Sequence, residues 1–153
     1  MKVSPIGSKE DIIKITQVIV EKVESLAKRT IGHELPISYL TIFSHTQHEY
    51  NRFVEWTSEL GTKSEANNGV RFSLKNPIKT IGGEITQIRI RKPDPYRSQI
   101  GCADLQVDNY TLFKSEELPK HTDNLRLIER HGYEMLEFFD LYSNNVLAYV
   151  VSK

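Results

Sequence analysis

Apolar and polar positions follow one order of elements twice along this chain. A strand, a helix and three strands are expected over residues 37–91, and the same order follows over residues 102–151. The offset of roughly 65 residues is too long for a solenoid repeat and suits two half-domains joined edge to edge. The pattern therefore predicts an α+β fold in which two βαβββ modules form a curved mixed sheet around a cleft.

Residues 8–31 precede the repeat and are expected to form an N-terminal helix. Apolar side chains recur there at helical spacing and give one stripe: Ile12, Ile15, Ile19, Val23 and Leu26. Ser8 can cap the start of this helix, and Gly32 suits its end. Because the repeat does not need this helix, we expect it to pack on the sheet. An exposed stripe would instead favour a protein-interaction module.

Two segments alternate between apolar and polar residues as half-buried strands do. In residues 84–91, EITQIRIR, the pattern places Thr86, Ile88 and Ile90 on one face and Ile85 with the polar residues on the other. In residues 102–107, CADLQV, the polar positions again share one face. If the apolar faces pack against helices, the opposite faces line one cleft. The candidate ligand-binding residues are Gln87, Arg89, Arg91, Asp104 and Gln106.

Caps and turns divide the rest of each module. Thr46 with Glu49 is a capping-box pattern for a second helix, which Gly61 would close. Residues 67–69, Asn-Asn-Gly, predict a tight hairpin because Asn and Gly tolerate left-handed backbone angles. Asp108 can cap a short helix in the second module.

The length, charge and cysteine content of the chain limit the classes of protein to which it can belong. The chain has 153 residues, and we expect residues 1–153 to form a single domain. Its 20 basic and 20 acidic residues cancel, so there is no overall charge that would attract nucleic acid. The single cysteine, Cys102, fits a reducing compartment, and no apolar run has the length of a membrane span. We expect a soluble cytoplasmic protein with no nucleic-acid or membrane partner and leave its oligomeric state open.

Several segments together resemble the vicinal oxygen chelate superfamily, the glyoxalase and extradiol-dioxygenase group. They are ISYLTIF before a capped helix ending in LG, the hairpin at NNG, the strands EITQIRIRKPDP and CADLQV, and the ending YEMLEFFDLYSNNVLAYV. The helical lead before the first strand is similar to that of YecM-like bacterial proteins. The resemblance covers residues 8–151 and implies a ligand site between the two modules.

In metal-using members of that superfamily, side chains from the first and last strands of each module meet at one divalent ion. Carried over to this chain, the positions fall on Pro36, Arg91, Asp104 and Ala148, the last with Leu147 or Tyr149 as alternatives in register. Only Asp104 offers a usual ligand, whereas a catalytic metal needs at least three. We therefore expect no family metal and no other cofactor.

The arginines favour a small anionic ligand instead. Arg89 and Arg91 can bind a carboxylate or phosphate through paired donors, and Asp104 can orient an arginine or accept from a ligand hydroxyl. We expect at least one of these arginines to hydrogen-bond Asp104, or both to converge on one bound anion. The structural alternative is a solvated sheet face with one Arg–Asp pair and no ligand. The chain is thus interpreted as a small-molecule-binding protein or degenerate enzyme.

The sequence keeps two further chemical readings open. Glu137 shares a strand face with apolar residues, where an enclosed carboxylate can act as a general acid or base. A metal-dependent lyase, isomerase or dioxygenase with shifted ligands would draw on Asp104 and Glu137 with His33 or His45. Whether the chain is an enzyme is left undecided by its sequence.

Overall fold

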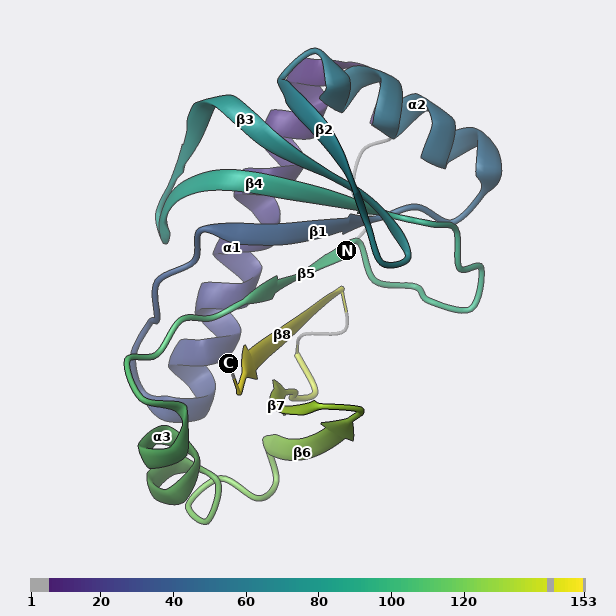
Figure 1. Ribbon diagram of the computed structural model, residues 1–153. Helices are drawn as coiled ribbons and strands as arrows, with labels where there is room; N and C mark the ends of the chain where they lie inside the picture. The colour runs from purple at the N-terminus through teal and green to yellow at the C-terminus, as the bar shows by residue number, and fades with distance from the viewer. Residues whose placement is uncertain (1–5, 143–144, 153) are drawn as a thin grey trace.

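The computed structural model describes residues 6–142 and 145–152. In this part of the chain, one helix precedes an eight-stranded mixed sheet that is curved and does not close (Figure 1). The first module contains β1 (Tyr39–Phe43), α2 (Gln47–Ser58), β2 (Gly61–Ala66), β3 (Gly69–Thr80) and β4 (Gly83–Arg91). The second contains β5 (Gly101–Asp104), α3 (Tyr110–Glu117), β6 (Leu125–Arg130), β7 (Tyr133–Phe138) and β8 (Val146–Val151).

The strand order, β2-β3-β4-β1-β5-β8-β7-β6, confirms the expected doubling. In each module the first strand pairs in parallel with the last, β1 with β4 and β5 with β8. The two first strands pair antiparallel at the centre of the sheet, where Thr41 lies opposite Cys102. The modules are therefore joined edge to edge through β1 and β5. The sequence predicts a turn at residues 143–145 before β8, of which residues 143–144 lie outside the described residues.

Helix α1 (Lys9–Ile31) runs across one face of the sheet and fills the core (Figure 1). Its start and end follow the expected chemistry, because the Ser8 side chain accepts a hydrogen bond from the Asp11 backbone N–H and Gly32 is left-handed, with φ of 90°. The predicted apolar stripe is buried throughout. This burial counts against docking of a partner through the stripe. No helix of the described residues is long and apolar enough to cross a membrane.

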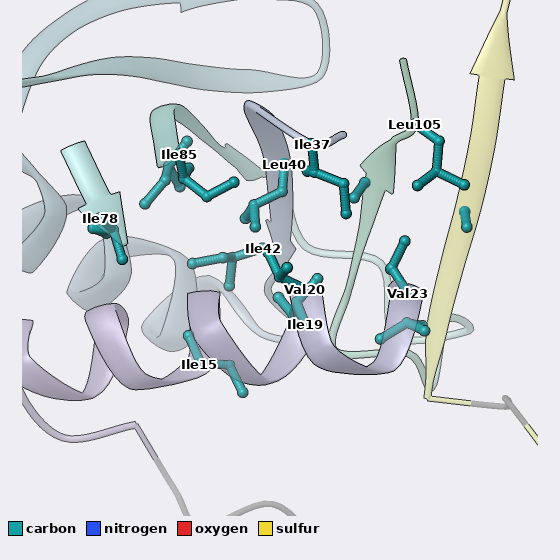
Figure 2. Packing of buried hydrophobic residues seen from close by; sticks show 14 of the residues in the cluster. Ile15, Ile19, Val20, Val23, Ile37, Leu40, Ile42, Ile78, Ile85 and Leu105 are labelled. Carbon is teal, nitrogen blue, oxygen red and sulfur yellow. The ribbon is translucent and has the colours of Figure 1, made fainter. Parts of the chain in front are cut away.

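The alternation predicted for β4 is wrong at its beginning. Ile85 is fully buried and points with Leu40 and Ile42 toward α1, whereas Thr86 is exposed (Figure 2). The cause is a register shift between Ser73 and Ile78 in the β3–β4 ladder. Such an irregularity changes which residues face the core on either side of it. Beyond it, alternation holds, and Ile88 and Ile90 are buried as expected.

Two boundaries differ from the sequence prediction, and one predicted turn is confirmed. Gly61 is the first residue of β2 and does not close α2, which ends at Ser58 with Glu59 as its C-cap. Asn109, rather than Asp108, caps α3 by accepting a hydrogen bond from the Leu112 backbone N–H. The predicted Asn-Gly hairpin is confirmed, with Asn68 at φ of 62° between β2 and β3.

The helices leave the other side of the sheet uncovered. Helix α1 packs against β3, β5, β7 and β8, and α2 lies beside it over β2, β3 and β4. Helix α3 contacts the same side through Phe113, whose ring stacks on that of the buried Phe138 at 6.5 Å between centroids. No helix in the described part of the chain covers the opposite side, which is called the open face below.

Candidate functional site

The strand ladders arrange polar side chains of the open face in two neighbouring rows. One row runs from Arg89 on β4 to Thr41 on β1 and Cys102 on β5. The next row runs from Asp104 on β5 to Tyr149 on β8 and Glu137 on β7. Residues directly opposite each other in neighbouring strands share a face. The open-face cluster is defined here as Thr41, Arg89, Cys102, Asp104 and Tyr149.

Arg89 is held in place by its own neighbours. Its Nε donates to Thr41 Oγ1 at 3.2 Å, and its Nη1 donates to the Asn67 carbonyl oxygen at 3.2 Å. The side chain is half-buried. Its Nη2 has no hydrogen-bond partner among the residues that the structure describes. A guanidinium fixed on two sides with donors left over can bind an anion at little cost in side-chain entropy.

Arg91 points toward the loop that joins the two modules. Its guanidinium lies 4.9 Å from the Phe43 ring centroid, and its Nη2 is 3.7 Å from Asp94 Oδ2. This carboxylate offsets part of its charge. Arg97, on the same loop, lies close enough to Tyr149 to influence its ionisation. Two further arginines, Arg91 at the end of β4 and Arg97 on the following loop, therefore lie beside the open-face cluster that contains Arg89.

Asp104 differs from the expected arrangement because no hydrogen bond or ion pair joins it to Arg89 or Arg91. Its carboxylate is half-buried and has no such partner anywhere in the described residues. Burial raises the pKa of Asp104 above its usual value, and the charge of Arg89 lowers it only in part. The expectation of a direct Arg–Asp104 bond is wrong. The reason is that β1 separates β4 from β5, which places their backbones roughly 10 Å apart.

Cys102 and Tyr149 add neutral polar groups to the cluster. Burial, with a smaller effect of Asp104, raises the pKa of the Cys102 thiol to about 11. That thiol is therefore protonated at neutral pH and a poor nucleophile. Burial also raises the pKa of Tyr149, helped by the nearby Glu137. Both side chains thus present neutral groups, a thiol and a phenol, beside Asp104.

Glu137, the candidate acid or base, is paired. It is buried with 5% of its surface exposed, and its Oε1 accepts from Arg126 Nε at 2.5 Å. The Arg126 guanidinium also lies 4.7 Å from the Phe139 ring centroid. This arrangement gives Glu137 a structural partner on β6. Three strands, β1, β5 and β8, lie between Glu137 on β7 and Arg89 on β4.

Gln106 and Gln87 are separated in the structure. Gln106 is exposed just beyond the end of β5 and donates from Nε2 to Ser38 Oγ at 2.6 Å. Gln87 is half-buried on β4, opposite Tyr39. Asp104 and Gln106 therefore lie together, Arg89 and Gln87 lie on β4 on the far side of β1, and Arg91 turns to the connecting loop.

A hollow of about 710 Å³ begins at Asp104, beyond the ends of β5 and β8. We call it the strand-end hollow; its lining is Leu35, Pro36, Asp104, Leu105, Gln106, Val107, Asp108, Tyr110, Val151 and Ser152. A second hollow of about 520 Å³ shares Tyr110 and Ser152 with it. Between them, Tyr110 Oη and Lys114 Nζ donate to Glu134 Oε2 at 2.8 and 2.7 Å. These two bonds fix α3 at the border of the strand-end hollow.

The described residues do not gather a metal-ligand set. Within them, no group of three or more His, Cys, Asp or Glu side chains could hold an ion. The His45 ring is occupied by Glu49 and the Gln99 carbonyl, and the His33 ring contacts the Glu34 carbonyl. The shifted set of Asp104 and Glu137 with either histidine is therefore not brought together.

Replacing Asp104 with asparagine is expected to leave the protein at least as stable at pH 7 as the parent. The raised pKa means that the folded state holds this proton more tightly than the unfolded state. Ionisation therefore costs stability as the pH rises above the unfolded value of 3.8, and the neutral amide avoids that cost. Urea unfolding at pH 7 and pH 4 measures the effect. The gain should shrink at the lower pH, and a clearly less stable variant at pH 7 would contradict it.

Comparisons with known proteins add information on the fold. No family model matches the chain, and no curated protein matches it. One solved structure, described as "Structural Genomics, Protein EC4020", is similar to this chain with a TM-score of 0.68. The match covers 99% of this chain and 94% of that chain at 11% sequence identity. At that identity the likeness concerns the fold alone.

Proposed function

We propose that this chain is a small-molecule-binding protein of the vicinal oxygen chelate type that binds an anionic metabolite on its open face without the family metal. The observation that carries the proposal is the geometry of Arg89. Two protein acceptors fix its guanidinium at a half-buried position of the cluster, and Nη2 has no partner among the residues that the structure describes. Arg91 and Arg97 add positive charge beside it, and in the described part of the chain a carboxylate, Asp94, contacts Arg91 but none contacts Arg97.

The doubled βαβββ order supports the family part of the proposal. The two modules meet through their first strands, which is the arrangement that the resemblance leads one to expect. The single, buried cysteine supports a cytoplasmic location, since a reducing compartment would keep Cys102 as a thiol.

The two alternatives receive less support. A metal-dependent lyase, isomerase or dioxygenase needs at least three convergent ligands, and the described residues gather no such group. An interaction module based on α1 needs exposed apolar surface, whereas Ile12, Ile19 and Val23 are fully buried. Binding without a resident metal therefore remains the better explanation of the open face.

Replacing Arg89 with alanine should weaken anion binding roughly tenfold or more, because hydrogen bonds to charged groups contribute about 1.5–3 kcal/mol. A thermal-shift screen of inorganic phosphate, short carboxylates and sugar phosphates would identify an anion that stabilises the parent. Titration calorimetry would then compare its affinity for the parent and for Arg89→Ala. The fold should persist, because the aliphatic part of Arg89 lies outside the main core cluster.

The matched control is Arg52→Ala. Arg52 is an exposed arginine of α2, on the helix-covered side, where it contacts Trp56 and Glu55. This variant loses the same charge and should bind the anion as the parent does. Equal weakening in both variants would indicate a general charge effect. Unchanged binding in Arg89→Ala would refute the assignment of Arg89, and the absence of any anion that stabilises the parent would refute anion binding.

A further inference from the structure

Asp104 is a half-buried carboxylate without a hydrogen-bonding partner in the described residues, and it borders the strand-end hollow. A carboxylate removed from water usually obtains hydrogen bonds from the protein, because leaving it unpaired is costly. Arg89 influences its charge but does not reach it. Something that enters the hollow and donates a hydrogen bond would satisfy Asp104.

The lining of the strand-end hollow favours donors over anions. It contains the carboxylates of Asp104 and Asp108 and no Lys, Arg or His. An anionic group would be repelled at this end of the site, whereas a hydroxyl or ammonium group would be attracted. Apolar side chains complete the wall at Leu35, Pro36 and Val151. The hollow therefore suits a small ligand part that is neutral or cationic and partly apolar.

The two ends of the site, Arg89 and Asp104, prefer ligand groups of opposite character and are held at a fixed separation by the sheet. Arg89 on β4 offers donors, and Asp104 on β5 offers acceptors, with β1 between them. Their strands are roughly 10 Å apart, and their positions differ by two residues along the strands, so their backbones are roughly 12 Å apart. The long Arg89 side chain shortens the gap between the functional groups. A carboxylate or phosphate that carries a hydroxyl or an amine on a neighbouring carbon has a size that can bridge such a gap.

We propose that the ligand carries an anionic group bound by Arg89 and a neighbouring hydroxyl or ammonium group bound by Asp104, with its remaining atoms in the strand-end hollow. This inference rests on the proposed function and names its ligand class: hydroxy acids, amino acids and the corresponding phosphate esters. Arg89 selects the charge, and Asp104 selects the donor. An anion without a donor would leave the Asp104 carboxylate unsatisfied.

The test uses matched ligands that differ only in the donor. Propionate, lactate and alanine form one series, and ethyl phosphate, 2-hydroxyethyl phosphate and phosphoethanolamine form a second. Saturation-transfer NMR and titration would measure affinities for the full chain down to the millimolar range. In at least one series, a donor-bearing ligand should bind roughly tenfold or more tightly than the ligand without a donor. The preferred donor distinguishes hydroxyl from ammonium recognition.

Two variants keep the test specific. Asp104→Asn should remove the preference for the donor, so that the donor-bearing and donor-free ligands of one series bind within about twofold of each other, because a neutral amide replaces a charged acceptor. Asp123→Asn, which changes an exposed carboxylate outside both hollows, should keep the preference. Thermal unfolding of both variants would verify that they are folded.

The outcomes separate this inference from the proposed function. Anions that bind through Arg89 with no preference for a donor would overturn the inference and leave the proposed function standing. A preference that survives in Asp104→Asn would also overturn it, since the donor would then be held elsewhere. If neither series binds to the parent, or if binding is unchanged in Arg89→Ala, both conclusions fall.

Discussion

Replacing Phe72 with alanine is expected to lower the free energy of unfolding by about 3–5 kcal/mol. Phe72 lies on β3 opposite Ile88, and none of its surface is exposed. The substitution removes a large aromatic side chain from the buried core cluster. The cost combines lost burial with a cavity that the surrounding strands cannot fill completely. Urea unfolding followed by circular dichroism would measure it.

Leu112→Ala is the matched control for Phe72→Ala. Leu112 is a large apolar residue on α3 with 52% of its surface exposed, and its truncation should change stability by no more than about 0.5 kcal/mol. A loss below about 1 kcal/mol for Phe72→Ala would contradict the packing described for the first module. Since Phe72 supports the strand pair that carries Arg89, the variant should also weaken anion binding near its unfolding midpoint.

The fold was predictable from the sequence where several local signals agreed. For α1, the apolar stripe, the Ser8 cap and the Gly32 stop all pointed to the same helix, and the structure has it at Lys9–Ile31. The last strand, Val146–Val151, ends at the residue where the second module was expected to end. The doubled order of elements was readable because each module combines a capped helix with alternating strands. Local periodicity thus determined the element types and most of their limits.

The prediction of which side chains face the core failed where the orientation of a residue depended on the neighbouring strand. Ile85 follows the alternation of EITQIRIR in sequence, but a register shift opposite it on β3 turns it into the core. Nothing in β4 itself encodes that shift. The N-cap of α3 was mispredicted for a similar reason. Asp108 and Asn109 are both good capping residues, and only the backbone geometry selects Asn109.

For the candidate site, the sequence predicted which face of its own strand each residue occupies, but not how the strands lie relative to one another. Alternation correctly placed Arg89 and Asp104 on the open face, but their lateral separation follows from the strand order, which the sequence does not state. Tyr149 entered the sequence analysis only as an alternative metal position, although its place two residues from Leu147 on an alternating strand was a usable signal. The strand-end hollow combines segments around Pro36, Asp104 and Val151, which only the fold brings together.

Replacing Gly101 with alanine is expected to lower the free energy of unfolding by about 3 kcal/mol, at the upper end of the range for overpacked sites. Gly101 begins β5, where α1 crosses close to the strand. A Cβ at this position would lie 2.6 Å from Ile19 Cδ1 and would also collide with the carbonyl oxygen of Thr41. The Thr41 oxygen belongs to the backbone of β1 and cannot move without disturbing the central strand pair. Differential scanning calorimetry and urea unfolding would measure the loss.

The contact with Ile19 makes the Gly101→Ala prediction testable in two ways. Gly7→Ala is the matched control, because among the described residues a Cβ there meets only Asp11 Oδ2, at an ordinary 3.6 Å, and its effect should be within about 0.5 kcal/mol. Ile19→Val removes the Cδ1 atom and should cost about 0.5–1.5 kcal/mol in the parent. In the Gly101→Ala background the same change relieves a collision, so it should cost less or stabilise. Equal costs in the two backgrounds would show that α1 does not press on β5 at this point. That result would refute the conclusion that α1 packs closely on β5 and so fixes the positions of Cys102 and Asp104.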